Sequence, residues 1–425
     1  MFTVNKQGDA GTVTAPNVVV PFYLYAALSF LVATFLLCAS PVSPGDHYFS
    51  PHTLAITHVM ALGWGTMIIL GASHQLVPVL VEGKLYSHKL AHLTFCCAAV
   101  GIPLLVYAFY TFNMGWPAKT GAILINTAVA LFLVNILCSR AKQDNVHVVF
   151  VVTATCWLFT TTFAGLLLVF NFTQPLLQED ALHYLPLHAH LGIAGWFLLL
   201  VTGVGSRLIP MFLVSKYTRP GLLWWIYGLV NGGLAGFVLL FLYLHRPVVY
   251  FLPLASILAA IILLIRYCYN CYKERIRRRV NKQVKLSLLS VSMMLIPLAL
   301  LVVVTVLLLV TTENTRLVMV YGFSIFFGWL TAIILGMTFE TLPFIIWNNV
   351  YHIQAGRGGT PSPQDLFSNK LFNGTALSYL LGFLLFTGGM LVQQGGMIRL
   401  GAALLLVCAF LYNLNTFRVA FHKPG

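Results

Sequence analysis

Residues 58–78 read HVMALGWGTMIILGASHQLVP, and residues 190–210 read HLGIAGWFLLLVTGVGSRLIP. Both stretches begin with His and then place a Gly-Trp pair, a Gly and a Pro at identical intervals. Residues 323–343, FSIFFGWLTAIILGMTFETLP, repeat the Gly-Trp, the Gly and the Pro but begin with Phe. The three copies are 132 and 133 residues apart. General preferences of membrane helices for Gly and Trp explain the residue types but not the shared spacing, which indicates an internal repeat.

The composition around these stretches is that of a polytopic membrane protein. Hydrophobic residues make up 59% of the 425 residues and charged residues only 8%. A soluble domain carries about 25% charged residues, so a water-facing surface cannot be built here. The chain holds twelve apolar stretches long enough to cross a bilayer. The composition excludes a secreted disulfide scaffold, and the eight cysteines lie mostly in or near spans.

The positive charges follow the predicted topology. The net charge is +14, and when each loop is assigned to its side, one side holds Lys119, Arg246, Arg316 and Arg399 while the other holds the remaining 20 of 24 basic residues. The positive-inside rule then places the basic side and both termini in the cytoplasm. The basic run from Lys273 to Lys285 is the strongest marker. The charge is therefore explained by topology rather than by nucleic-acid binding, and we expect an integral protein of a bacterial inner membrane.

The period of the repeat predicts three pseudo-symmetric units of four spans in one membrane domain. Repeat one covers about residues 18–140, repeat two about 147–270 and repeat three about 286–416. Sites in membrane proteins built from repeats often lie between the repeats. The prolines Pro78, Pro210 and Pro343 are expected to break their helices near the cytoplasmic ends.

Three histidines within the spans are the main candidates for a cofactor site. Because polar side chains are costly in a membrane, they are functional candidates by default. His58 and His190 occupy equivalent repeat positions in the outer half of the bilayer. His188 lies two residues before His190, so the two imidazoles should point about 200° apart around their helix. His58 can then face one of them, and two imidazoles from facing helices are the ligand set of a six-coordinate haem iron.

The chain resembles the haem–copper oxidase subunit I superfamily, which includes cytochrome c oxidase subunit I and NnrS-like membrane proteins. The resemblance rests on the twelve-span, threefold topology and on the segments 54–80 and 186–212, above all His188-Ala-His190. It implies haem b, copper as a second cofactor, and electron transfer or the binding and reduction of nitric oxide or oxygen. Arg246, Arg316 or Arg399 would contact the haem propionates. Electrons would come from quinol or a donor protein, and other respiratory subunits are implied partners.

Several residues of that superfamily have no counterpart here. The tenth span carries Phe323 where the family has a His pair, and the seventh offers only His245 near its outer end. A complete copper centre is therefore not expected. We predict a haem between repeats one and two, held by His58 and either His188 or His190. The other histidine would face repeats two and three and bind a second haem, a copper ion or a hydrogen-bond partner.

A second candidate cluster lies near the cytoplasmic side. His88 and His92 are one helical turn apart, and His74 is close in sequence, so these three could bind a metal ion. Glu340 and Arg207 occupy equivalent repeat positions and could form an ion pair. Two alternatives to a haem protein that acts as an oxidoreductase stay open at this point. One is a threefold-repeat transporter, and the other is a non-catalytic assembly subunit.

Overall fold

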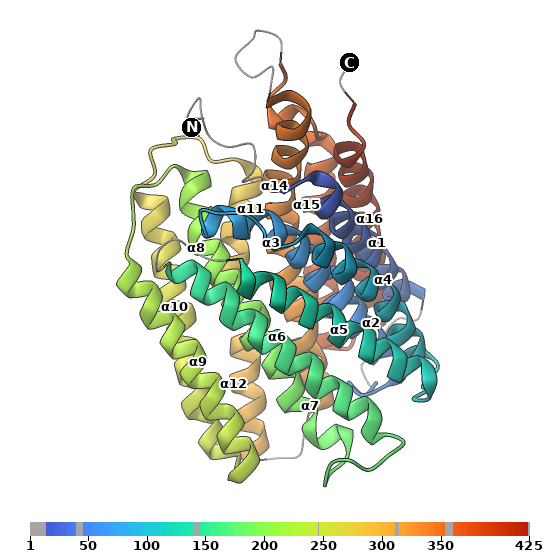
Figure 1. Ribbon diagram of the computed structural model, residues 1–425. Helices are drawn as coiled ribbons and strands as arrows, with labels where there is room; N and C mark the ends of the chain where they lie inside the picture. Colours follow the sequence, from blue (N-terminus) through green and yellow to red (C-terminus); the bar gives the residue numbers. More distant parts are fainter. Residues whose placement is uncertain are drawn as a thin grey trace.

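The computed structural model describes residues 14–39, 46–139, 145–244, 246–310, 314–352 and 360–423. Within these ranges all regular elements are helices, apart from one isolated antiparallel bridge between Ser215 and Arg275 (Figure 1). Twelve helical spans in the same ranges are long and apolar enough to cross a membrane. The predicted class, an all-α polytopic membrane protein, is therefore confirmed.

The spans differ in how regular they are, because five of the twelve described spans consist of more than one helical segment. In chain order the elements are α1 (Pro16–Ala39), α2 (Pro51–His58), η1 (Val59–Thr66), α3 (Met67–Leu80), α4 (His88–Tyr110), α5 (Trp116–Cys138), α6 (Val146–Asn171), α7 (Ala181–His190), η2 (Leu191–Leu198), α8 (Leu199–Leu213), α9 (Pro220–Tyr243), η3 (Pro247–Tyr250), α10 (Phe251–Lys273), α11 (Lys282–Met293), α12 (Leu295–Val310), α13 (Thr315–Phe323), η4 (Ser324–Leu330), α14 (Thr331–Tyr351), η6 (Pro363–Asp365), α15 (Asn369–Val392) and α16 (Gly395–Ala420).

A π-helical segment interrupts the second, sixth and tenth spans, and each one contains the Gly-Trp pair of the sequence repeat. These segments are η1, η2 and η4, and they begin directly after His58, His190 and Phe323. A π segment widens the helix locally and often marks a functional site. The expected helix breaks at Pro78, Pro210 and Pro343 are wrong, because α3, α8 and α14 continue through these prolines. The irregularity lies instead next to the histidines.

The second glycine of each sequence motif allows a close contact with the preceding span. A Cβ atom on Gly71 would lie 2.7 Å from Phe22 Cβ of α1, and one on Gly203 would lie 2.3 Å from Phe150 Cβ of α6. A Cβ on Gly336 would lie 2.4 Å from Ser287 Oγ of α11. Real Cβ atoms do not approach neighbours this closely. Each of the three spans can therefore pack at this distance only because the residue is glycine.

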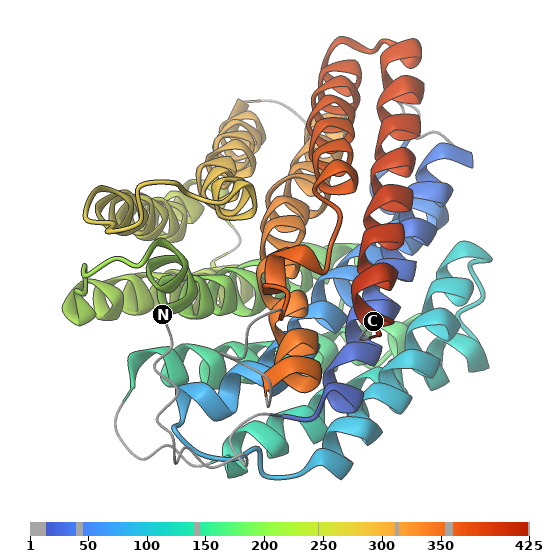
Figure 2. The ribbon, with the colours of Figure 1, turned by 90° about the horizontal axis from the view of Figure 1, so that it is seen from above.

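Pairs of neighbouring helices surround the central spans. Figure 2 shows the hairpins α4–α5, α9–α10 and α15–α16 at separate corners of the molecule. Two of the hairpins share one type of hydrogen bond, in which an Asn side chain of the second helix accepts from the backbone N–H of the Ser that precedes the first helix. Asn135 Oδ1 accepts from the backbone N–H of Ser87 at 2.9 Å, and Asn415 Oδ1 accepts from that of Ser368 at 2.8 Å. The first and last spans also pack together, where Asn413 Nδ2 donates to the carbonyl oxygen of Ala27 at 2.8 Å.

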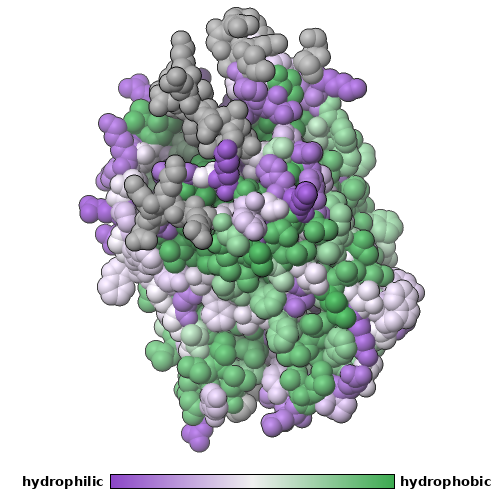
Figure 3. Space-filling model, in the orientation of Figure 1, coloured by the Kyte–Doolittle hydropathy of each residue, from purple (hydrophilic) through white to green (hydrophobic). Residues whose placement is uncertain are grey.

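The visible surface has the distribution expected for a bilayer. Hydrophobic side chains cover the middle of the molecule, and hydrophilic ones gather at the end where the C-terminus lies, with fewer at the opposite end (Figure 3). The loop between α10 and α11, which carries Arg277, Arg278 and Arg279, joins its helices at this hydrophilic end (Figure 1). The arrangement supports a lipid environment. Helices α2 and α7 lie in the other half of the molecule.

Candidate functional site

His58 and His190 lie at equivalent points of their spans. His58 is the last residue of α2 and directly precedes η1, and His190 is the last residue of α7 and directly precedes η2. The ring nitrogen Nδ1 of His58 is 2.7 Å from the carbonyl oxygen of Leu54, and that of His190 is 2.7 Å from the carbonyl oxygen of Pro186. A carbonyl only accepts, so Nδ1 must carry the proton. The lone pair of each neutral imidazole then lies on Nε2.

The first pair of facing side chains is His58 with His188. Their ring centres are 6.4 Å apart and their planes differ by only 17°. Phe109 of α4 lies on another side of His58, with ring centres 4.4 Å apart. The Nδ1 atom of His188 is buried and has no hydrogen-bond partner among the described residues. Leaving a buried polar atom unpaired costs about 1–3 kcal/mol.

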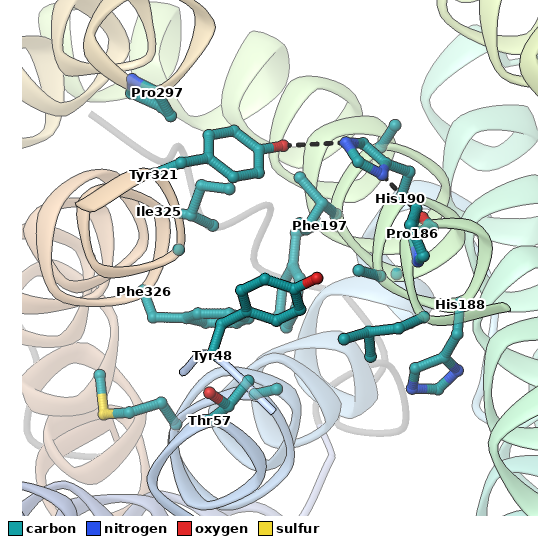
Figure 4. Close-up of a pocket in the computed structure, with 18 of the residues that line it drawn as sticks. Tyr48, Thr57, Pro186, His188, His190, Phe197, Pro297, Tyr321, Ile325 and Phe326 are labelled. Atoms are coloured by element: carbon teal, nitrogen blue, oxygen red, sulfur yellow. Dashed lines mark hydrogen bonds between the residues drawn. The ribbon is translucent and has the colours of Figure 1, made fainter. Parts of the chain in front are cut away.

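His190 points the other way, toward the tenth span. Its Nε2 accepts a hydrogen bond from the hydroxyl of Tyr321 on α13 at 3.2 Å, and the two rings lie 6.0 Å apart at 23°. Phe237 of α9 lies 5.2 Å from the imidazole on a further side. Figure 4 shows the divergence of His188 and His190 from α7. The two-residue spacing therefore serves two different interfaces, as the helical geometry predicts.

One cavity of about 570 Å³ reaches all three histidines. This size is typical of sites for small molecules and cofactors. The cavity lies between the second, sixth, ninth and tenth spans, with Tyr48, Phe197 and Phe326 around its centre (Figure 4). The described residues that line it include no Asp, Glu, Lys or Arg. Its walls are mostly aliphatic and aromatic, so the cavity favours an apolar ligand that is fixed by a few polar groups.

The donor set limits what could be held here. No group of three or more His, Cys, Asp or Glu side chains with metal-binding geometry occurs in the described part of the chain. A tetrahedral metal site needs more protein ligands than two imidazoles. Two imidazoles on opposite sides of one ion, with metal–nitrogen bonds of about 2 Å, have ring centres about 6 Å apart. The ring centres of His58 and His188 are 6.4 Å apart, so the pair has a separation that would suit one ion held between two imidazoles.

The second predicted cluster does not form a metal-binding group in the described part of the chain. His74 is fully buried, with its ring 5.3 Å from that of Phe22 and 5.2 Å from that of Phe132. Both of its ring nitrogens lack a hydrogen-bond partner among the described residues. His88 and His92, at the start of α4, are exposed instead. His74 therefore packs as an aromatic ring in the core, and the two exposed histidines lie on the surface.

The three predicted arginines lie outside the cavity. Arg246 and Arg399 are exposed, and Arg316 is half-buried in the first turn of α13, five residues before Tyr321. The predicted pairing of Glu340 with Arg207 is wrong. The carboxylate of Glu340 accepts a hydrogen bond from Asn281 Nδ2 at 2.9 Å, and Arg207 is exposed. His245, the other histidine considered near the outer face, lies outside the described residues.

Two tryptophans of the repeat motif are hydrogen-bonded between the central spans. Trp64 Nε1 donates to Thr331 Oγ1 and Trp196 Nε1 donates to Thr66 Oγ1, both at 3.1 Å. Each threonine lies two residues after the tryptophan of its own motif. The equivalent position in the sixth span is Leu198, which has no hydroxyl. Trp329 Nε1 is buried without a partner among the described residues.

Two residues of the site were not identified from the sequence. Tyr321 bonds to His190, and Gly165 of α6 leaves the space that the His188 ring occupies, because a Cβ there would be 2.9 Å from His188 Cε1. Tyr321 lies two residues before Phe323, and thus at the repeat position of His188 rather than at that of His58 and His190. The repeat register could have pointed to Tyr321, whereas a glycine in an apolar helix is common in membrane spans and no local pattern marks Gly165.

Comparison with models of protein families finds no match, and comparison with curated protein sequences finds no significant relative.

Proposed function

We propose that this protein binds a b-type haem between His58 and His188 and transfers electrons within the membrane. The observation that carries the proposal is the pair of imidazoles from two central spans, near-parallel and 6.4 Å apart. The hydrogen bond from His58 Nδ1 to Leu54 presents Nε2 as a ligand atom. His188 supplies the second imidazole of the pair from the end of α7. The apolar walls would exclude water.

The ligand set favours electron transfer over gas chemistry. A bound haem would supply a one-electron redox couple. His58 and His188 would both be used to hold the haem, so neither the cofactor nor these residues would offer a free binding position to a diatomic gas. His58 and His188 would fix the iron and its potential, and Phe109 would hold the His58 ring in place. Nitric oxide or oxygen binding would need one of these ligands to leave.

The same proposal includes a threefold arrangement of the twelve spans. Three observations support it: the π segments at equivalent places, the close glycine contacts of Gly71, Gly203 and Gly336, and the two Trp–Thr hydrogen bonds. The haem would then lie between repeats one and two. The excess of basic residues on one side supports a cytoplasmic location for both termini. A copper ion stays an alternative partner for His190.

The test is a reduced-minus-oxidised optical spectrum of the protein purified in detergent from haem-supplied cells. The α and Soret bands of a six-coordinate b haem are expected in the unaltered protein. They should be lost in His58→Ala and in His188→Ala. The matched control is His92→Ala, which removes an exposed histidine and should leave the spectrum unchanged.

The variant His190→Ala separates the two possible ligand pairs. It should keep the haem bands, because His190 faces Tyr321 rather than His58. Loss of the bands in His190→Ala with retention in His188→Ala would reassign the ligand. A folded protein without haem would overturn the proposal.

A further inference from the structure

The eighth and ninth spans pack against each other less closely than the two other pairs at the same place in the sequence repeat. Those pairs are α5 with α6 and α16 with α1, and each lies side by side along its length. Thr162 Oγ1 of α6 donates to Asn126 Oδ1 of α5 at 2.9 Å, and Asn413 Nδ2 of α16 donates to the carbonyl oxygen of Ala27 of α1 at 2.8 Å. By contrast, α10 touches α12 at few points. The boundary between the eighth and ninth spans is therefore the loosest of the three.

The cavity extends along this boundary. One face of α12 lines it over most of the helix, at residues spaced three or four apart. The lining residues are Pro297, Leu298, Leu301, Val304, Thr305 and Leu308 of α12, together with Pro253, Leu254, Ile257 and Ile261 of α10. From Pro297 to Leu308 the helix rises about 17 Å. One leaflet is half of a hydrocarbon core of about 30 Å, so this part of the cavity, here called the slot, is as long as one leaflet is deep.

The walls of the slot offer hydrocarbon and no free polar group. Thr305 is the one polar residue among those that define the slot, and its hydroxyl donates to the carbonyl oxygen of Leu301 in the same helix at 2.8 Å. A polar ligand atom would lose its hydrogen bonds to water here without a replacement, which is costly. A flexible apolar chain has no such cost. The slot therefore suits a hydrocarbon chain that lies parallel to the helices.

The slot opens toward the lipid, on the side away from the proposed haem. Leu308 lines the cavity and is 41% exposed, so the cavity reaches the membrane-facing surface of α12. Figure 4 shows Pro297 across the cavity from His188. A chain can therefore enter sideways from the bilayer without displacing the two imidazoles.

Positive charge borders the mouth of the slot near Leu308. Tyr250 at the start of the eighth span and Val318 at the start of the tenth line the cavity at this end. They follow Arg246 and Arg316 by four and two residues, and Arg246 is exposed while Arg316 is half-buried. A phosphate at the mouth can pair with these guanidinium groups while its tail lies between apolar walls. The charges and the walls match the two parts of a phospholipid.

We propose that the slot binds one acyl chain of a phospholipid from the leaflet opposite the basic loop of Arg277, Arg278 and Arg279, with the phosphate near Arg246 and Arg316. Lipid tails are as apolar as leucine side chains, so membrane spans are held together by close van der Waals contact rather than by exclusion from lipid. The acyl chain supplies these contacts between α10 and α12, where the corresponding spans pack directly. The lipid is then a bound part of the protein, and the proposal does not rest on the haem.

The retained lipid is identified by native mass spectrometry of the full chain, after exchange into a mild detergent that removes loosely held lipid. The unaltered protein should retain one phospholipid with two acyl chains per protein chain. No retained lipid, or a retained species with the mass of a free fatty acid, would overturn the proposal.

Three tryptophan variants locate the lipid. Val304→Trp and Ile257→Trp fill the slot from α12 and from α10, and both should lose the retained phospholipid. The matched control is Val303→Trp, because Val303 is the neighbour of Val304 but is 45% exposed and is not part of the cavity lining. It should retain the phospholipid like the unaltered protein. Circular dichroism checks that each variant is folded, and if one slot variant does not fold, the other decides. Equal retention in the slot variants and in the control would refute the site.

Discussion

Backbone carbonyls fix the histidines of this protein before any ligand is present. His58 and His190 each bond to the carbonyl four residues earlier, at the same distance of 2.7 Å. The bond sets both the tautomer and the direction of the ring. His188 lacks such a bond in the described structure, and its position depends on the space beside Gly165. The two ligands of the proposed haem are therefore held in different ways.

Gly165→Ala should disturb the proposed haem site without unfolding the protein. The new Cβ would lie 2.9 Å from His188 Cε1, and the free ring end can move away at little cost. Loss of a group that orients a metal ligand typically weakens binding about 10- to 100-fold. Haem content per protein, measured by pyridine haemochrome assay, should fall accordingly.

A matched glycine provides the control for this prediction. Gly228 lies within α9, and a Cβ there would meet no atom within 4 Å. Gly228→Ala should keep full haem content and be slightly more stable, because alanine favours helix. Equal haem content in both variants would contradict the role of Gly165.

Among the helical elements, the three π segments are the feature that links the sequence motif to the cavity. They place His58 and His190 at the start of a widened turn, and they contain the tryptophans that bond to threonines of neighbouring spans. The bonds connect the second span with the sixth and with the tenth. The remaining pair, Trp329 and Leu198, makes no such bond. Both of these residues line the cavity.

Thr66→Val should lower the thermal stability of the protein. The substitution keeps the side-chain shape but leaves the buried Nε1 of Trp196 without its acceptor, which costs about 1–3 kcal/mol. The midpoint of unfolding in detergent should therefore fall. It can be followed by tryptophan fluorescence or circular dichroism.

Thr202→Val is the matched control for this bond. Thr202 is equally buried, but its hydroxyl already lacks a partner among the described residues. Its loss should leave the midpoint unchanged or raise it. If both valine variants lowered the midpoint of unfolding equally, the hydrogen bond of Trp196 would not contribute to stability beyond the loss of any buried hydroxyl.

At the scale of the whole molecule, the class and span number could be predicted from the sequence because bilayer crossing depends on length and hydropathy alone. The divergence of His188 and His190 also followed from helix geometry. The choice of His188 as the partner of His58 could not be predicted, because it depends on the packing of α6 at Gly165. The π segments were missed for a similar reason. A proline can be recognised in a sequence as a residue that disturbs helices, whereas no residue type is specific to a π-helical turn.

The contact between α1 and α16 also bears on how the chain can be rearranged. The first and last spans are neighbours, since Asn413 of α16 bonds to the carbonyl of Ala27 in the middle of α1. A circular permutant that joins the two chain ends by a flexible linker and opens between the exposed residues Arg277 and Arg278 starts with the ninth span. It keeps every span in its original orientation, because an even number of crossings is moved. We expect it to insert and fold, with haem bands as the readout, so the order of the three units would be a historical feature rather than a requirement for assembly.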